Sequence, residues 1–187
     1  MKFDDLLNEI KGCLNDKHYL AALSLALSIP DVCGSVEYSN ITAVSQRYKE
    51  WYKNHIGKNE NLLNMVNDCE DYPWIDEDIV YSIRCNMFHE GFPKVNTSQV
   101  KRDINKSDVF YLALYESNRF SSNDADLIVN DEEWTIKKKT MINVSYLCNL
   151  LVDAGELFYK NNKEKFKVDN SMEDYYSTGI FKINFIK

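Results

Sequence analysis

Apolar residues near the start of the chain recur at intervals of three and four, the spacing of one face of an amphipathic helix. This pattern predicts a helix over residues 2–15. Its apolar face consists of Phe3, Leu6, Leu7, Ile10 and Leu14. Residues 17–27 are apolar nearly all round, which predicts a central, buried helix. Pro30 predicts the end of that helix, because proline disfavours helical geometry in the residue before it. Residues 31–40, which include Gly34, are expected to form a loop.

A third helix is predicted over residues 41–56, with Gly57 as its natural stop. The residues expected to face inward are Val44, Tyr48, Trp51 and Tyr52. Residues 58–75 are polar, and we expect a short helix and a loop there.

The next helix is predicted over residues 76–90. Its first turn is acidic, with Asp76, Glu77 and Asp78, and negative charge there favours the positive end of the helix dipole. The apolar face is continued by Ile79, Val80, Ile83, Met87 and Phe88. Gly91 and Pro93 are expected to close the helix.

From residue 106 to 138 the pattern changes to short β-type runs separated by clusters of Asn, Asp and Ser. The runs are 109–114, 126–129 and 134–136. They predict a small β-hairpin or a three-stranded patch inserted between helices.

A last long helix is predicted over residues 140–160. Its inward side carries Val144, Leu147, Leu151, Ala154 and Phe158. In the polar tail, 163–187, the alternation from residue 180 to 185 is typical of a final strand, which we expect to pair with the β patch. The chain is therefore expected to be mainly α: one domain over 1–187, an up-and-down helical bundle with a small β-hairpin or three-stranded appendage.

Composition narrows the class of protein. A net charge of −7 disfavours a protein that coats long stretches of nucleic acid, so any RNA contact is expected to be short and local. The cysteines form no C-x-x-C pair, which points away from a zinc site or a disulfide framework. They are Cys13, Cys33, Cys69, Cys85 and Cys148. With neither the apolar run of a signal peptide nor about 18 uninterrupted apolar residues, no membrane span is expected. The chain is expected to be cytoplasmic.

The segment with the most chemical content is Arg84-Cys85-Asn86-Met87-Phe88-His89, near the end of the fourth predicted helix. Arginine binds phosphate through its planar fork, and histidine transfers protons near neutral pH. Five helical positions correspond to about 500°, so Arg84 and His89 lie roughly 140° apart around the axis. One helix alone is therefore a poor site. Arg84 has a simpler alternative, an ion pair with Glu77 or Asp78 of its own helix, and His89 has the role of a helix cap.

The spacing Arg-x-x-x-x-His at the end of a late helix, in a helical domain, resembles the HEPN superfamily. The resemblance implies a metal-independent endoribonuclease, of the kind found in toxin–antitoxin, phage-defence and CRISPR systems. It also implies a homodimer in which the Arg and His of two subunits face each other across the interface. Arg84 would then bind the scissile phosphate and His89 would act as acid and base. The family commonly has a polar residue, often Asn, directly after the arginine; here Cys85 holds that place, and Asn86 would supply the substitute hydrogen bond.

A second resemblance covers the first half of the chain: residues 21–34, then 47–52, then 84–89. This ordered set is similar to a group of small bacterial proteins without an assigned activity. It implies a real family but brings no function with it.

Three function classes remain open. The first is the HEPN-type ribonuclease with Arg84, His89 and Asn86 as catalytic residues, no cofactor and no metal, RNA as the substrate and an antitoxin as a possible partner. The second is a non-catalytic HEPN-like module that binds a partner protein or a nucleotide. The third is a purely structural protein in which the spacing of Arg84 and His89 is accidental.

Several other residues have two interpretations. Arg47, Tyr48 and Trp51 form an RNA-stacking surface in one reading; in the other, Tyr48 and Trp51 belong to the core. Asp31 is either a loop or cap residue or an acidic group near the site.

For the remaining candidate residues, a structural or surface role is expected rather than a functional one. Cys85 is expected to be a buried, inert cysteine rather than a reactive thiol. The run Lys137–Lys139 is expected to be a solvated helix start rather than a phosphate-contacting patch. His18 and His55 are expected to be isolated surface residues near helix ends.

Overall fold

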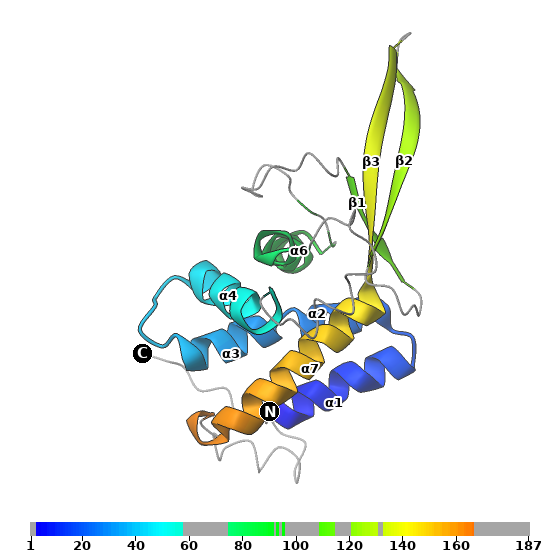
Figure 1. Cartoon of the computed structure of the whole chain (residues 1–187). Coiled ribbons are helices and arrows are strands. Elements are labelled where there is room, and N and C mark those ends of the chain that lie inside the picture. The colour runs from blue at the N-terminus through cyan, green and yellow to red at the C-terminus, as the bar shows by residue number, and fades with distance from the viewer. Residues whose placement is uncertain are drawn as a thin grey trace.

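The computed structural model describes residues 3–57, 75–91, 93, 95, 109–114, 121–130 and 133–166. Within these ranges the helical elements are α1 Phe3–Asn15, α2 Tyr19–Ala26, α3 Ile29–Glu37, α4 Val44–Tyr52, the π-helical turn η1 Lys53–Gly57, α6 Glu77–Glu90, α7 Val144–Asn162 and the 3-10 turn η3 Lys163–Lys165. The strands are β1 Val109–Ala113, β2 Ser121–Asn130 and β3 Glu133–Asn143. The structure is a helical bundle with a small β appendage, as predicted (Figure 1).

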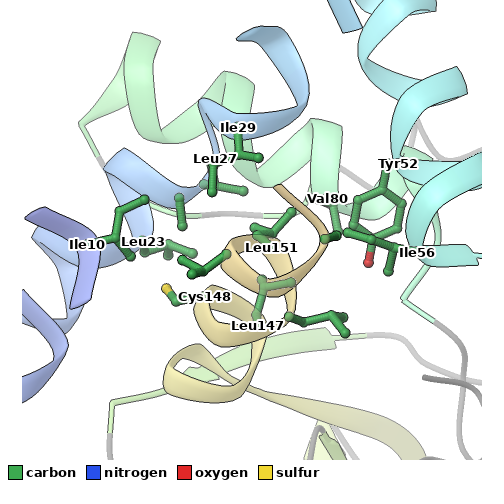
Figure 2. Close-up of a cluster of buried hydrophobic side chains, with 14 of the residues drawn as sticks. Ile10, Leu23, Leu27, Ile29, Tyr52, Ile56, Val80, Leu147, Cys148 and Leu151 are labelled. Atoms are coloured by element: carbon green, nitrogen blue, oxygen red, sulfur yellow. The ribbon is translucent and has the colours of Figure 1, made fainter. Parts of the chain in front are cut away.

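Helix α7 is the centre of the bundle and packs against α1, α2 and α3. Leu147 and Leu151 of α7 belong to one core cluster with Leu23 of α2, Leu27 directly after α2, and Ile10 of α1 (Figure 2). Each of these five side chains is fully buried, and burying such a side chain contributes about 1.5–3 kcal/mol. The predicted apolar faces of the first and last helices are confirmed, and the last helix begins at Val144 rather than at residue 140.

The prediction of a helix end at Pro30 and a loop over 31–40 is wrong. Pro30 lies in the first turn of α3, which runs from Ile29 to Glu37. A proline there is tolerated, because the N–H that it lacks would have no partner in the first turn of a helix. The preceding Leu27 and Ser28 already have helical backbone angles, so the chain bends from α2 into α3 without a loop.

The stretch Tyr19–Glu37, 19 residues that include an 18-residue window with a mean hydropathy of 1.5, is long and apolar enough to cross a membrane by length and composition alone. A core helix also passes this test. Here Ala22, Leu23, Leu27, Ile29 and Cys33 are fully buried within the bundle.

Helix α4 carries its aromatic residues inward. Tyr48, Trp51 and Tyr52 are fully buried, as predicted. Val44 was expected to face inward as well but is 45% exposed, because it lies at the very start of the helix. The prediction is therefore confirmed for the aromatic side chains and wrong for Val44.

Helix α6 begins and ends with clear caps. The Asp76 carboxylate accepts hydrogen bonds from the backbone N–H groups of Asp78 and Ile79, both at 3.0 Å. Gly91 follows the helix with φ of 70°, a conformation that glycine adopts without strain. Phe88, predicted on the apolar face, is 52% exposed. It lies about 140° around the axis from the buried Ile83, outside the packed face.

The sheet has three strands in the order β1-β3-β2, with β1 parallel and β2 antiparallel to β3. The strands are longer than the runs 126–129 and 134–136 predicted. Lys137–Lys139 lie within β3 and not at a helix start; the register places Asp126 opposite Lys137. Figure 1 shows the β2–β3 hairpin extending away from the helices, and β3 leads directly into α7.

Two predictions fall outside the described residues. They are the short helix and loop over 58–75, of which the structure describes only the buried Ile75, and the final strand over 180–185.

Candidate active site on helix α6

The predicted site residues lie in the second half of α6. This helix packs against α4 and, more lightly, against α2. Ile79, Val80 and Ile83 are buried and fix which side of α6 faces the bundle. The rotation of the helix therefore determines where Arg84, Asn86 and His89 lie.

Arg84 forms an ion pair with Asp31 of α3, 53 residues earlier in the chain. Arg84 Nε donates to Asp31 Oδ2 at 3.0 Å, and Arg84 Nη2 lies 2.8 Å from the same oxygen in the ion pair. Each side chain is 22% exposed. The alternative in which Arg84 pairs with Glu77 or Asp78 is wrong: Arg84 pairs with Asp31, and Asp78 pairs with Lys49 of α4, at 2.7 Å. Asp31 thus lies in the first turn of a helix and not in a loop, and its carboxylate contacts Arg84 at the candidate site.

Two aromatic rings of α6 flank the Arg84 guanidinium. Its central carbon lies 5.4 Å from the centre of the Phe88 ring and 6.0 Å from that of Tyr81. Both distances are within cation–π range. Tyr81 in turn packs edge-on against the buried Tyr48, with ring centres 5.1 Å apart. The guanidinium is thereby held by a carboxylate from α3 and by rings of its own helix.

Burial raises the pKa of Asp31 above its usual range, although the charge and hydrogen bond of Arg84 and the charge of Arg47 oppose that rise. Burial by itself would lower the pKa of Arg84, but Asp31 and Cys85 raise it above its usual value. Arg84 therefore stays charged at all ordinary pH values.

A close approach of α3 and α4 sets the position of Asp31. Gly34 lies one turn after Asp31, and a Cβ placed on it would come within 2.8 Å of the backbone oxygen of Arg47. Arg47 is anchored in turn, because its Nη1 donates to the carbonyl of Ile41 at 2.7 Å. Only glycine lets the two helices come so near.

The other two predicted catalytic residues lie elsewhere on α6. His89 is exposed in the last turn, about 140° around the axis from Arg84. Asn86 is only 8% exposed and belongs to the packed side of the helix. Cys85, beside Arg84, is half-buried, so the prediction that it is buried is wrong. Within one chain, the structure therefore brings Arg84 together with Asp31, and not with His89 or Asn86.

The RNA-stacking interpretation of Arg47, Tyr48 and Trp51 is wrong, because both aromatic side chains are fully buried. They are core residues, the alternative that the sequence also allowed. Among the described residues, neither the Tyr48 hydroxyl nor the Trp51 Nε1 has a hydrogen-bond partner.

Of the two histidines expected to be isolated surface residues, His18 is exposed and His55 is not isolated. The Nε2 of His55 lies 2.7 Å from Glu37 Oε2, and the His55 ring stacks on Trp51 with ring centres 4.9 Å apart.

Sequence reasoning did not connect Asp31 with Arg84. The local pattern of Asp31, an acidic residue after a proline, indicates only a turn or a helix start. No spacing rule relates two residues on different helices, so the pairing has no sequence signature.

No family model, no curated protein and no solved structure matches this chain. Within the part of the chain that the structure describes, no group of three or more His, Cys, Asp and Glu side chains is placed to hold a metal ion.

Proposed function

We propose that this protein is a metal-independent endoribonuclease of the HEPN type, whose active site is completed by a second copy of the chain. The observation that carries the proposal is the state of Arg84. Its guanidinium is anchored on one edge by Asp31 and remains partly exposed, on a helix that ends with an exposed histidine. Phosphodiester transfer needs a fixed cation and a histidine at one site, and a second copy of the chain would bring Arg84 and His89 together.

In the proposed reaction, Arg84 binds the non-bridging oxygens of the scissile phosphate. A neutral His89 accepts the proton of the ribose 2′-hydroxyl, and the 2′-oxygen attacks phosphorus. The bond to the 5′-oxygen breaks, and a protonated His89 donates a proton to that leaving oxygen. The products are a 2′,3′-cyclic phosphate and a free 5′-hydroxyl, and no water is consumed.

A dimer supports this reaction better than a single chain. The angle of about 140° between Arg84 and His89 keeps them on different sides of one helix. Two copies of α6 that meet at their C-terminal halves would place the Arg84 of one chain near the His89 of the other. Phe88 lies between Arg84 and His89 around the helix axis and is 52% exposed. An exposed aromatic side chain at this position supports a protein contact there.

The wider setting belongs to the proposal as well. The net charge of −7 favours a short RNA contact over a long one. A cytoplasmic toxin–antitoxin or phage-defence protein, held in check by a neutralising partner, fits a nuclease of this kind.

The test is cleavage of single-stranded RNA by the purified protein in EDTA. Arg84→Ala and His89→Ala should each lower the rate by at least about a hundredfold, the usual contribution of general acid–base catalysis. The controls are Lys11→Ala, which removes an exposed cation paired with Glu156, and His18→Ala, which removes another exposed histidine. Both should cleave at the wild-type rate. Wild-type protein that leaves RNA intact, or site variants that cleave like the controls, would refute the proposal.

A non-catalytic HEPN-like module that binds a partner protein or nucleotide is the second candidate. It is favoured by two observations: Arg84 already has a carboxylate partner, and Asn86 lies on the packed side of α6. Stable binding of such a partner by His89→Ala protein, together with RNA left intact by the wild type, would select this candidate.

A further inference from the structure

The geometry of the Arg84–Asp31 pair is asymmetric. Both Arg84 donors, Nε and Nη2, converge on one oxygen, Oδ2. The other oxygen, Oδ1, is buried and has no hydrogen-bond partner among the described residues. A guanidinium has two forked edges, Nε with Nη2 and Nη1 with Nη2. Asp31 uses only the first of them.

The anchor on that edge is rigid. Asp31 lies in the first turn of α3, and Gly34 on the next turn packs against the Arg47 backbone of α4. The rings of Phe88 and Tyr81 lie within cation–π distance of the guanidinium. Since 22% of the Arg84 side chain is exposed, the group is fixed without being sealed from solvent.

We propose that Asp31 is a positioning residue for RNA cleavage: it holds the Nε/Nη2 edge of Arg84 so that the Nη1/Nη2 edge meets the scissile phosphate. This inference rests on the proposed ribonuclease function. Asp31 does not touch the substrate; it acts by keeping the guanidinium in one orientation. A donor that is already oriented requires no reorganisation when charge develops on the phosphate.

Positioning and masking make opposite predictions. A carboxylate that masks an arginine competes with phosphate for the same fork, and its removal would increase phosphate binding and cleavage. A positioning carboxylate stays in place when phosphate binds, and its removal lowers the rate of the chemical step. The contact through a single oxygen, on one edge only, favours positioning.

The first measurement is the separation of kcat from KM in steady-state RNA cleavage. Asp31→Asn keeps the shape of the side chain but removes its charge. We expect kcat to fall by roughly 10–100-fold, because a small misplacement of the Arg84 guanidinium lowers the rate of the chemical step by about that factor. KM should change by less than about threefold, because the substitution removes an interaction that acts in the transition state and leaves RNA binding in the ground state largely intact. Asp31→Glu, which keeps the carboxylate, should recover part of kcat.

The matched control is Asp78→Asn. Asp78 also bridges α6 to a neighbouring helix, through Lys49 at 2.7 Å, but lies away from Arg84. It should lower stability to a similar extent and leave kcat unchanged. Equal kcat in Asp31→Asn and Asp78→Asn, or faster cleavage by Asp31→Asn, would overturn the inference.

The second measurement does not need cleavage. A 2′-deoxy oligonucleotide, which lacks the attacking hydroxyl, is titrated into the protein while the side-chain Nε–H signal of Arg84 is followed by NMR. In the free protein, Asp31→Asn should shift this signal. Binding of the oligonucleotide to wild-type protein should leave it close to its starting position, because Asp31 keeps that edge. A shift on binding that matches the Asp31→Asn position would show displacement of Asp31 and refute positioning.

Failure of the two proposals can be told apart. If wild-type protein neither binds the oligonucleotide nor cleaves RNA, the ribonuclease function and the role of Asp31 both fall. If Arg84→Ala and His89→Ala abolish cleavage while Asp31→Asn cleaves normally, the ribonuclease function stands and only the role of Asp31 falls.

Discussion

Nε and Nη2 of Arg84 both contact a single oxygen of Asp31: Nε donates to Oδ2 at 3.0 Å, and Nη2 lies 2.8 Å from it. This pair ties α6 to α3, and through α3 to the centre of the bundle. Removing one member of such a partly buried pair lowers the stability of the fold, because the remaining charge is left without compensation. The pair therefore connects the stability of the fold to the candidate site.

Loss of Arg84 should destabilise the protein in a pH-dependent way. Burial raises the pKa of Asp31, so its contribution to stability is present below the pKa of the unfolded chain and is lost as pH rises through the folded value. Arg84 limits that loss. Arg84→Ala should thus lower the free energy of unfolding by about 1–3 kcal/mol at pH 7, and by less at pH 3, where Asp31 is protonated.

Denaturant unfolding at both pH values measures this difference. In an Asp31→Asn background, Arg84→Ala should lose its pH dependence, because no carboxylate is left to ionise. An equal cost at pH 3 and pH 7 in the wild-type background would contradict the assignment.

The buried tyrosines of α4 should respond differently to loss of their hydroxyl groups. Tyr52 donates to the carbonyl of Ile75 at 3.1 Å, whereas the Tyr48 hydroxyl has no partner among the described residues. Tyr52→Phe should cost about 1 kcal/mol of unfolding free energy, the usual net value of one hydrogen bond. Tyr48→Phe should be neutral or stabilising, since it removes an unsatisfied buried group. Thermal or denaturant unfolding distinguishes the two, and equal losses would show that Tyr48 has a partner.

The close approach of α3 and α4 should make Gly34 intolerant of a side chain. Gly34→Ala would place a Cβ 2.8 Å from the Arg47 carbonyl oxygen, and backbone cannot yield as a side chain can. The free energy of unfolding should fall by about 1–3 kcal/mol. Gly12→Ala is the control: nothing lies within 4 Å of its Cβ, and in α1 alanine should stabilise by about 0.5–1 kcal/mol. A Gly34→Ala protein as stable as wild type would mean that α3 and α4 are further apart.

The proposed dimer should depend on Phe88. Because this residue is 52% exposed, Phe88→Ser should leave the fold intact and weaken self-association by at least about tenfold, the effect of losing roughly 1.4 kcal/mol of apolar contact. Leu157→Ser on α7, with 56% exposure, is the matched control and should not change association. Analytical ultracentrifugation measures both. A monomeric wild type, or equal effects of the two variants, would refute the dimer interface.

The local pattern of apolar and polar residues predicted most of the secondary-structure elements, but it gave the wrong role for Pro30 and the wrong lengths for two strands. The apolar spacing of α1 and α7 led directly to their buried faces, because helix periodicity is a local property. The role of Pro30 was predicted wrongly because proline occurs both after the end of a helix and in the first turn of a helix. The local sequence does not indicate which of the two applies here. The β-type run 109–114 matched β1, whereas the runs 126–129 and 134–136 indicated strands but not their length, since pairing between β2 and β3 extends both strands beyond these runs.

The candidate site shows the same division. Arg84 and His89 were found through their spacing along one helix. Asn86 was chosen from its neighbourhood in the sequence, and the structure places it on the packed side of α6 instead. Tyr48 and Trp51 were ambiguous because aromatic residues occur both in cores and on RNA-binding surfaces.

The sequence by itself determined the helical class, the helix that carries Arg84 and His89, and the angle that keeps them apart on one chain, because each follows from local periodicity and helix geometry. Only the tertiary structure decided that Arg84 pairs with Asp31, that α3 replaces the expected loop, and that Phe88 is exposed. Those outcomes depend on how α3, α4 and α6 pack against one another. Contacts between helices far apart in sequence are set by the balance of burial and close approach over the whole core, and no local pattern encodes them.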